Sequence, residues 1–377
     1  MHFKISAHNF MSFNFWQTHF SKQGLLKTCF KLLVLLTVFA NNVNAQQTLI
    51  YSDAERHYKL GIELFSKEKY SAAIEEFERT LKATEGISHT VLVNSAFYSA
   101  ASSAELFNRN AEPKLLKFIN ENPNESKSKL AAFYLAKWYF KQKQYKKAGQ
   151  YFNKSDVLML DNESVSEYYF KSGYSYFMNG ELPLASKQFQ QIINTESRYQ
   201  SAANFYYAHI AFASNNYETA LKSFNKLNES EAFGPFAPYY ITQIYFQQQK
   251  YDEVIAYAPK ALEKTDVQNP NEIKRILSES YFRKGDYINA ANGFEEYRSI
   301  SPSLNRDDLY KLGYAHYKSG NYAKAIDNLQ RVVNTDDTLS QNAYFHLADC
   351  FLKTNNKANA RNAFQQAMKQ NFNPKIK

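Results

Sequence analysis

The aromatic residues are the part of this sequence that most clearly points to a function, because their spacing and number suit the binding of another molecule. The chain contains 29 Tyr and 30 Phe, and aromatic residues make up 16% of its 377 positions. Many recur at intervals of about 35 residues. In most repeats, one aromatic residue stands three positions before a small residue and another stands four positions after it. The position directly after the small residue is polar or aromatic, and its residue type varies from repeat to repeat. The resulting trios are Phe133, Lys137 and Phe140; Phe170, Tyr174 and Phe177; Phe205, His209 and Phe212; Tyr239, Gln243 and Phe246; Arg275, Glu279 and Phe282; Tyr310, Tyr314 and Tyr317; and Phe345, Asp349 and Leu352. The predicted partner-binding site consists of the residues of the first six trios, except Glu279.

Two interpretations of the trios stay open at this point. Rings offer a large contact area with few rotors to freeze, which suits the grip of an extended or helical polypeptide. Only Lys137 and Arg275 could clamp an acidic partner, so an apolar or aromatic-rich partner is favoured. The alternative is that the rings pack against rings of adjacent helices and thicken the core.

Signatures of catalysis are missing from the sequence. It contains no phosphate-cradling glycine loop, no G-x-S-x-G, no H-E-x-x-H and no C-x-x-C. We therefore predict a protein that is not an enzyme and needs no cofactor or metal. His316 and His346 could form a metal pair, but packing is the favoured role for both, and His209 is the histidine expected to have a function. Glu279 and Asp349 are expected to be solvated.

The net charge of +9 arises from 45 basic and 36 acidic residues. The first 45 residues carry four lysines and no acid, so the remainder holds 41 bases against 36 acids, a balance of +5. The bases of this remainder form no long runs. Nucleic acid is therefore not expected as a partner.

The trios must be positioned by a repeated pair of helices. The small residues of the first helices are Gly61, Ala136, Gly173, Ala208, Thr242, Ser278, Gly313 and Ala348, with one irregular copy around Ala100 and Ala101. The residues twelve positions later are Ala73, Ala148, Ala185, Ala220, Val254, Ala290, Ala325 and Ala360. One turn further on stand Phe77, Phe152, Phe189, Phe224, Ala258, Phe294, Leu329 and Phe364. Small residues let two helix backbones approach, and a large residue fills the adjoining hole. Gly or Asn is expected at φ > 0 in the turn between the helices, as at Gly180, Asn215, Gly285, Gly320 and Asn355.

This pattern resembles the tetratricopeptide repeat, most clearly at Gly173, Tyr176, Ala185 and Phe189. The resemblance implies an all-α, right-handed α-solenoid of about nine helix-turn-helix repeats of ~35 residues. It also implies that the trios line a concave, partner-binding groove. We expect the array over residues 46–373, with irregular second and sixth repeats, and a stub over residues 374–377. The sequence is further similar to large exported tetratricopeptide proteins of Bacteroidetes-type bacteria.

The first 45 residues have the pattern of a signal peptide. Lys27 and Lys31 precede a nine-residue apolar run, and cleavage is expected after Ala45. The run is too short to cross about 30 Å of hydrocarbon. We therefore expect export to the periplasm or cell surface of a Gram-negative bacterium, with no transmembrane anchor after cleavage.

The favoured function is a noncatalytic exported scaffold that binds protein partners through an aromatic-lined concave groove, in envelope assembly or secretion. One alternative is a carbohydrate-binding solenoid, because exposed rings stack on sugars. Another is the N-terminal interaction module of a longer protein with a C-terminal effector domain. The C-terminal edge of the array has no evident polar cap, which favours self-association or chain continuation there, and we expect continuation.

Overall fold

The computed structural model describes residues 53–83, 87–301 and 304–376, and all regular structure in these ranges is helical. The predicted signal peptide lies outside the described residues. The α-helices are α2 (Asp53–Ser66), α3 (Tyr70–Lys82), α4 (His89–Glu105), α5 (Ala111–Glu121), α6 (Ser126–Lys141), α7 (Tyr145–Lys154), α8 (Asn162–Met178), α9 (Leu182–Gln190), α10 (Gln200–Ala213), α11 (Tyr217–Asn225), α12 (Ala237–Gln247), α13 (Tyr251–Leu262), α14 (Pro270–Lys284), α15 (Tyr287–Ile300), α16 (Arg306–Lys318), α17 (Tyr322–Gln330), α18 (Thr338–Lys353) and α19 (Lys357–Lys369). Short 3₁₀ turns are η1 (Val157–Met159), η2 (Gly234–Phe236) and η3 (Pro374–Ile376). The predicted all-α class is confirmed.

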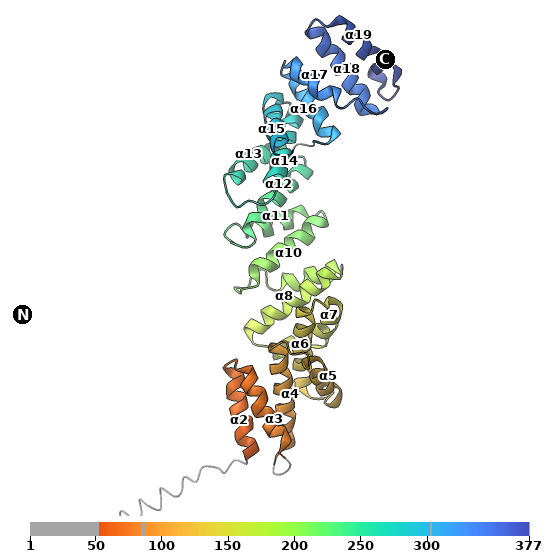
Figure 1. Ribbon diagram of the computed structural model, residues 1–377. Coiled ribbons are helices and arrows are strands. Elements are labelled where there is room, and N and C mark those ends of the chain that lie inside the picture. Colours follow the sequence, from red (N-terminus) through yellow and green to blue (C-terminus); the bar gives the residue numbers. More distant parts are fainter. Residues whose placement is uncertain (1–52, 84–86, 302–303, 377) are drawn as a thin grey trace, which may run out of the picture. The chain divides into compact units, whose positions relative to one another are not determined.

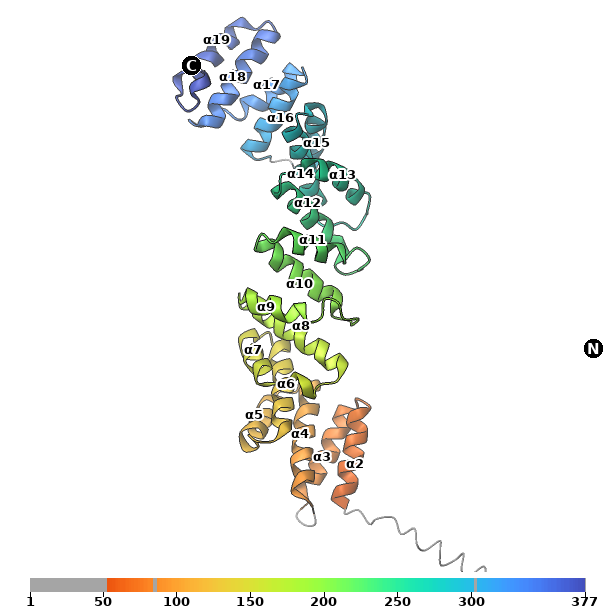
Figure 2. The same cartoon turned by 180° about the vertical axis from the view of Figure 1, so that it is seen from behind.

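The helices pack in consecutive pairs. Within a pair, α6 contacts α7, α8 contacts α9, and the same relation continues to α18 and α19, which lie side by side in both views (Figure 1, Figure 2). Each second helix also contacts the first helix of the next pair, from α5 and α6 to α17 and α18. Because the pairs from α6 and α7 to α18 and α19 contact one another in series, their core is continuous, as in a solenoid.

The chain divides into two compact units, Met1–Ser99 and Ala100–Lys377. The first unit contains α2, α3 and most of α4. Every residue of the predicted binding site lies in the second unit, so the site is described within that unit alone.

The predicted close crossing of paired helices is confirmed. Ala185 is fully buried on α9, and a Cβ added to Gly173 on α8 would lie 2.9 Å from the ring of Phe189. Likewise, a Cβ at Gly313 would lie 2.7 Å from Leu329. A side chain at either glycine would force the helices apart, so the small residues set how closely each pair packs.

The turn between paired helices has one backbone conformation throughout. Gly180 has φ 79° and Asn215 has φ 58°, as the sequence predicts. Lys143 and Gln249 occupy the same turn position and also have φ 58°, although neither is a residue type that favours this region. Tertiary packing imposes the turn at these two places in spite of the local preference.

The segment after α19 folds back onto α18. Gln341 is fully buried, and its Nε2 donates to the carbonyl oxygens of Ala367 and Gln370. Its Oε1 accepts from the backbone amides of Phe372 and Asn373. The predicted stub at residues 374–377 therefore follows a segment that four hydrogen bonds hold against Gln341, and η3 lies within the stub.

Candidate functional site

Each trio from α6 to α16 is covered by one residue from the first helix of the next repeat. In its own repeat, this covering residue stands two positions before the small residue. It therefore directly follows the first member of the trio of that repeat. The covering residues of the six trios from α6 to α16 are Lys171, Tyr206, Tyr240, Ile276, Lys311 and His346. Sequence analysis missed this row, although its spacing of about 35 residues matches that of the trios.

The trio on α8 shows the aromatic form of the arrangement. The ring of Tyr206, on α10, lies 6.3 Å from Phe170, 5.1 Å from Tyr174 and 5.2 Å from Phe177, measured between centroids. These are distances at which aromatic pairs attract. Tyr206 is half-buried, and burial raises the pKa of its hydroxyl to about 12, assisted by Tyr174. One tyrosine therefore joins three rings of the preceding repeat.

The next trio, on α10, repeats this geometry with a histidine in its centre. Tyr240 of α12 lies 6.2 Å from Phe205, 5.7 Å from His209 and 5.6 Å from Phe212. The His209 ring also contacts Phe177 of the preceding trio at 5.8 Å. The two trios are thus continuous.

The trio on α16 is covered by a histidine. His346 of α18 lies 6.3 Å from Tyr310, 4.8 Å from Tyr314 and 5.2 Å from Tyr317. Its Nδ1 is buried and has no hydrogen-bond partner. Burial, assisted by the charge of Lys318, lowers the pKa of His346 to about 4. His346 is therefore neutral at pH 7.

His209 is half-buried in a similar environment. Its Nδ1 also lacks a hydrogen-bond partner, and burial lowers its pKa. Both histidines act as neutral aromatic rings within their clusters at pH 7. Both histidines therefore serve in packing. His209 is also partly exposed, so part of its ring is accessible to another molecule.

The exposure of the rings supports both interpretations in part, since the rings pack against one another and also keep some accessible surface. Phe133 is only 2% exposed and packs against Phe152, so the prediction that it faces a partner is wrong for this ring. The other members of the predicted site are half-buried. Neighbouring rings cover part of their surface, and the remainder is available for contact. Because Phe133 belongs to the core, the partly exposed part of the predicted site begins at Lys137 and Phe140.

The trio on α6 is covered by a charge instead of a ring. Lys137 lies 2.6 Å from Glu105 and 3.1 Å from Glu167, and the covering Lys171 also pairs with Glu167. The Nζ of Lys171 lies 5.5 Å from the ring centre of Phe140. Burial opposes the charge of Lys137, but the two carboxylates outweigh it and raise the lysine pKa. Lys137 is therefore engaged within the chain instead of free to clamp an acidic partner.

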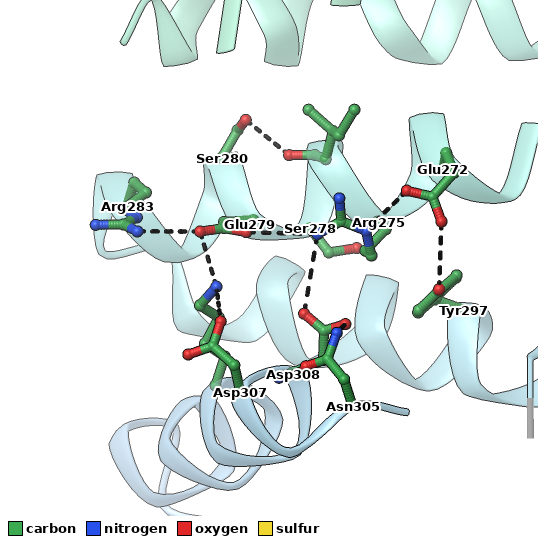
Figure 3. Close-up of polar contacts among 12 residues, drawn as sticks. Glu272, Arg275, Ser278, Glu279, Ser280, Arg283, Tyr297, Asn305, Asp307 and Asp308 are labelled. Carbon is green, nitrogen blue, oxygen red and sulfur yellow. Dashed lines mark hydrogen bonds and ion pairs between the residues drawn. The ribbon is translucent and has the colours of Figure 1, made fainter. Parts of the chain in front are cut away.

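The trio on α14 is the most polar, with the two charged residues Arg275 and Glu279, whose contacts Figure 3 shows. Glu279 is only 6% exposed, so the expectation that it is solvated is wrong. The covering Lys311 of α16 lies 2.8 Å from Glu279, and Arg283 lies 3.0 Å from the same oxygen. Lys311 also pairs with Asp307 at 2.5 Å. The network joins α14 and α16 through charge.

Arg275 ends this network on the other side. It lies 2.9 Å from Glu272, 3.7 Å from Glu279 and 4.0 Å from Asp308 (Figure 3). Asp308 is 1% exposed, and its burial raises the carboxyl pKa in spite of Arg275 and Lys311. Like Lys137, Arg275 is occupied by internal carboxylates. Neither base of the predicted site is a free anion clamp.

The trio on α12 lies in the repeat between the aromatic trio on α10 and the charged trio on α14. Gln243 Nε2 donates to the hydroxyl of Tyr239 at 2.9 Å, and Phe246 and Tyr239 pack against the core cluster that contains the covering Ile276. This repeat has a proline, Pro259, inside its second helix α13. Its trio is held by an aliphatic contact, with neither a ring nor a charge above it.

The remaining polar groups include His316, the other member of the metal pair that the sequence allowed. His316 is buried with its Nε2 3.1 Å from Glu295, and it does not meet His346, which lies among the tyrosines. Over residues 53–83, 87–301 and 304–376, no group of three or more His, Cys, Asp or Glu side chains is placed to hold a metal. No helix in these ranges is both long enough and apolar enough to cross a membrane.

A polar pocket of about 380 Å³ lies away from the trios, between the end of α9, the start of α10 and the end of α11. It is lined by Ile193, Asn194, Gln200, Ser201, Asn204 and Lys226. Ser201 stands at the repeat position of Arg306, whose guanidinium binds Asp337 and the carbonyl oxygen of Val332. The short serine side chain leaves this space unfilled in the α10 repeat.

Comparison with known proteins finds a family resemblance over the last part of the chain. The family model described as "Tetratricopeptide repeat" matches residues 310–374, which include most of α16 and all of α17 to α19. No curated protein matches the chain. Among solved structures, the C-terminal part of a TPR repeat-containing protein from Cytophaga hutchinsonii matches at 16% identity, covering 65% of this chain and 97% of that chain, with a TM-score of 0.48. A tetratricopeptide repeat protein from Parabacteroides merdae matches at 14% identity, covering 75% of this chain and 95% of that chain, with a TM-score of 0.31. These two likenesses are too weak to say anything about partners.

Proposed function

Because this chain carries tetratricopeptide repeats, we propose that it is a noncatalytic, exported scaffold that binds protein partners through its first-helix trios. The observation that supports the proposal is the half-buried state of the rings on α8 and α10. A ring needed only for packing can be buried fully, as Phe133 is. Rings that keep one side accessible on successive helices form an extended apolar surface, which suits a polypeptide partner.

The chemistry of the surface indicates the partner. Lys137 and Arg275 are paired with carboxylates of the chain, so they offer little to an acidic peptide. Phe170, Tyr174 and Phe177 offer rings instead, and rings bury apolar or aromatic side chains well. The partner of this proposal is therefore an extended or helical segment rich in apolar residues.

Export rests on the sequence of the first 45 residues, whose basic and apolar pattern is that of a signal peptide. In this proposal the scaffold works in the periplasm or at the cell surface, in envelope assembly or secretion. Secretion can be tested directly, by N-terminal sequencing of the mature protein from cell fractions. A mature chain that retains its first residues in the cytoplasm would contradict export.

The binding surface is tested by removing rings while keeping apolar volume. The variant Phe170→Leu/Phe177→Leu/Phe212→Leu should lose a specific protein partner in a crosslinking pull-down from envelope fractions of the source organism. A matched control is Leu184→Ala/Ile288→Ala, which alters exposed apolar residues of the second helices α9 and α15. Circular dichroism checks that all variants are folded equally.

The outcomes are distinct. If the control loses the partner and the ring variant keeps it, the binding surface lies on the second helices and the proposal fails. If no protein is lost but binding to a glycan array is reduced, the trios bind carbohydrate. Loss of one protein in the ring variant alone supports the trios as its binding site.

A further inference from the structure

One of the turns between paired helices is apolar, whereas the others are polar or contain glycine. Nine such turns lie in the described residues, and each has one residue with positive φ. That residue is Gly, Asn, Gln, Glu or Lys in eight turns, but it is Phe107, with φ 54°, between α4 and α5. The residue before it is also polar in eight turns and is Leu106 in this one. A left-handed conformation is costly for a bulky side chain, so strain at such a residue points to a function.

Packing does not account for these two side chains. Leu106 is 42% exposed and Phe107 is 39% exposed, whereas the ring of Phe133, which serves the core, is 2% exposed. The Nζ of Lys141 on α6 lies 5.1 Å from the centre of the Phe107 ring, so an exposed cation covers one side of that ring. The tip of the turn therefore presents an apolar pair beside a base.

The neighbouring turn, between α6 and α7, is rich in lysine. Lys141, Lys143 and Lys146 are all exposed. The indole Nε1 of Trp138, on the last part of α6, donates to the carbonyl oxygen of Asn108 at 3.1 Å. This hydrogen bond holds the lysine-rich turn against the apolar one, so the apolar pair and the lysines belong to one surface.

The chain does not neutralise the bases of this surface. Among the described residues, no carboxylate pairs with any of the three lysines or with the exposed Arg109, although the adjacent Lys147 pairs with Glu112 at 3.7 Å. Residues 105–156 carry eleven bases and five acids, a balance of +6, whereas residues 157–377 carry 24 bases and 23 acids. The positive charge that follows the first 45 residues is therefore concentrated in the stretch that contains these two turns.

We propose that the surface of these two turns binds an anionic phospholipid bilayer from outside, without crossing it. We name it the turn surface, and it consists of Leu106, Phe107, Arg109, Lys141, Lys143 and Lys146. The apolar pair enters the boundary between headgroups and acyl chains, while the long basic side chains reach the lipid phosphates. Apolar contact and charge act together, because either alone gives weak attachment.

The residue types of the turn surface favour a bilayer over an acidic protein. Three of its four bases are lysines, whose mobile point charges suit many phosphates at once. Recognition of a single carboxylate favours the planar fork of arginine instead. The apolar pair stands at the tip of a turn, a shape that suits insertion into a bilayer. This binding does not depend on the rings of α8 and α10.

Vesicle flotation tests the proposal with the chain from Gln46 onward. This chain keeps every residue that the structure describes, and it lacks the lysines and apolar run of residues 1–45, which would bind vesicles themselves. It should float with vesicles of phosphatidylcholine and phosphatidylglycerol but not with phosphatidylcholine alone, and added salt should weaken the binding. In the variant Phe107→Trp, tryptophan emission should shift to the blue on binding and be quenched by brominated lipid, whereas the buried Trp138 of the wild type should respond little.

The charge of the turn surface is tested by Lys141→Gln/Lys143→Gln/Lys146→Gln. This variant should lower the vesicle partition coefficient about tenfold or more. The matched control Lys222→Gln/Lys250→Gln/Lys260→Gln removes three exposed lysines between α11 and α13, and it should lower the coefficient about twofold or less. If both variants weaken binding equally, the net charge of the chain drives it and the proposal fails.

The apolar pair is tested by Leu106→Gln/Phe107→Asn, which introduces residue types found at these positions in other turns. Asn accepts positive φ better than Phe, so the melting temperature should stay the same or rise. Vesicle binding should fall about fivefold or more. The control Leu184→Gln/Ile288→Asn changes exposed apolar residues of α9 and α15 and should leave binding unchanged.

The ring variant Phe170→Leu/Phe177→Leu/Phe212→Leu should float like the wild type, which separates this proposal from the function proposed for the trios. Absence of binding to anionic vesicles at low salt would overturn the proposal. So would binding that Leu106→Gln/Phe107→Asn leaves unchanged, or a Phe107→Trp emission that vesicles do not alter. A marked fall in the melting temperature of Leu106→Gln/Phe107→Asn would assign the pair to packing and count against the proposal. Capture of an acidic protein or of DNA through the three lysines, without vesicle binding, would replace the bilayer by that partner.

Discussion

The trios on α8 and α14 occupy the same positions of the repeat but hold the next repeat by different forces. On α8, Tyr206 packs against three rings at 5.1–6.3 Å. On α14, Lys311 forms an ion pair at 2.8 Å with Glu279, a carboxylate that is only 6% exposed. The repeat thus fixes where the contact lies, and the residue types decide its chemistry.

This difference has energetic consequences. Ring contacts combine dispersion with apolar burial, and they change gradually when one atom is removed. A buried ion pair offsets the desolvation of both charges only while both partners are present. The α8 trio should therefore tolerate conservative changes that the α14 trio does not, and its partly open rings suit a binding surface better than the closed charge network does.

The largest effect is expected from Lys311→Met. The methionine keeps most of the side-chain volume, but it leaves Glu279 with only the two arginines of its own helix. We expect a loss of about 3 kcal/mol in the free energy of unfolding of this region, because one partner of a buried pair is removed. Urea denaturation combined with hydrogen exchange of α14 to α16 measures it, since repeats unfold in part independently.

The double variant Lys311→Met/Glu279→Gln is the control for that experiment. Removing both charges should recover much of the lost stability, because no unpaired carboxylate is left buried. If the single variant is as stable as the wild type, the two arginines suffice and the contrast between the two trios is smaller than the geometry indicates. Lys187→Ala, an exposed lysine on α9, controls for loss of charge alone.

The fold was more predictable from sequence than these contacts. The helix pairs, the buried Ala185 and Ala325, and the turn at Gly180 follow from local periodicity and residue size. The turns at Lys143 and Gln249 show no local signal, because packing imposes φ 58° on residues that do not favour it.

The site was predictable only in part. The trios were identified, and all but one of the predicted residues are partly exposed. The burial of Glu279 and the pairing of Lys137 were not foreseen, because each depends on charges about 30 positions away on another helix. Phe133 follows the same periodic rule as Phe170, yet it is buried, so periodicity identifies a face of the helix and the neighbouring repeat decides its depth.

An intermediate effect is expected from acid, and it acts on the trio covered by His346. The pKa of this histidine is about 4 in the folded chain, because of burial and Lys318, and about 6.5 when unfolded. The unfolded chain therefore binds the proton more readily between these values, so the free energy of unfolding falls as the pH is lowered from about 6.5 toward 4. Linkage sets an upper limit of about 3 kcal/mol, and we expect about 2 because the ring is partly exposed.

Hydrogen exchange of α16 and α18 between pH 6.5 and 5 measures this effect before most carboxylates titrate. The variant His346→Tyr, which copies the ring at position 206, should flatten the pH dependence of this region. Asp349 favours protonation of His346 and opposes part of the shift, so His346→Tyr/Asp349→Asn tests whether the remaining slope comes from that carboxylate. An unchanged slope in His346→Tyr would assign the acid sensitivity to other groups, among them His316, whose pKa is also lowered by burial.

The smallest effect is expected from Tyr206→Phe. The ring remains among Phe170, Tyr174 and Phe177, and only the hydroxyl and its hydrogen bond with Tyr174 are lost. Because Tyr206 is half-buried and water can replace part of that bond, the free energy of unfolding should fall by about 0.5–1 kcal/mol, with partner capture by the scaffold unchanged. The same measurement on Lys311→Met, which is equally conservative in volume, gives the contrast. If Tyr206→Phe costs as much as Lys311→Met, the α8 trio depends on a polar bond as strictly as the α14 trio does, and ring packing is not what distinguishes the two repeats.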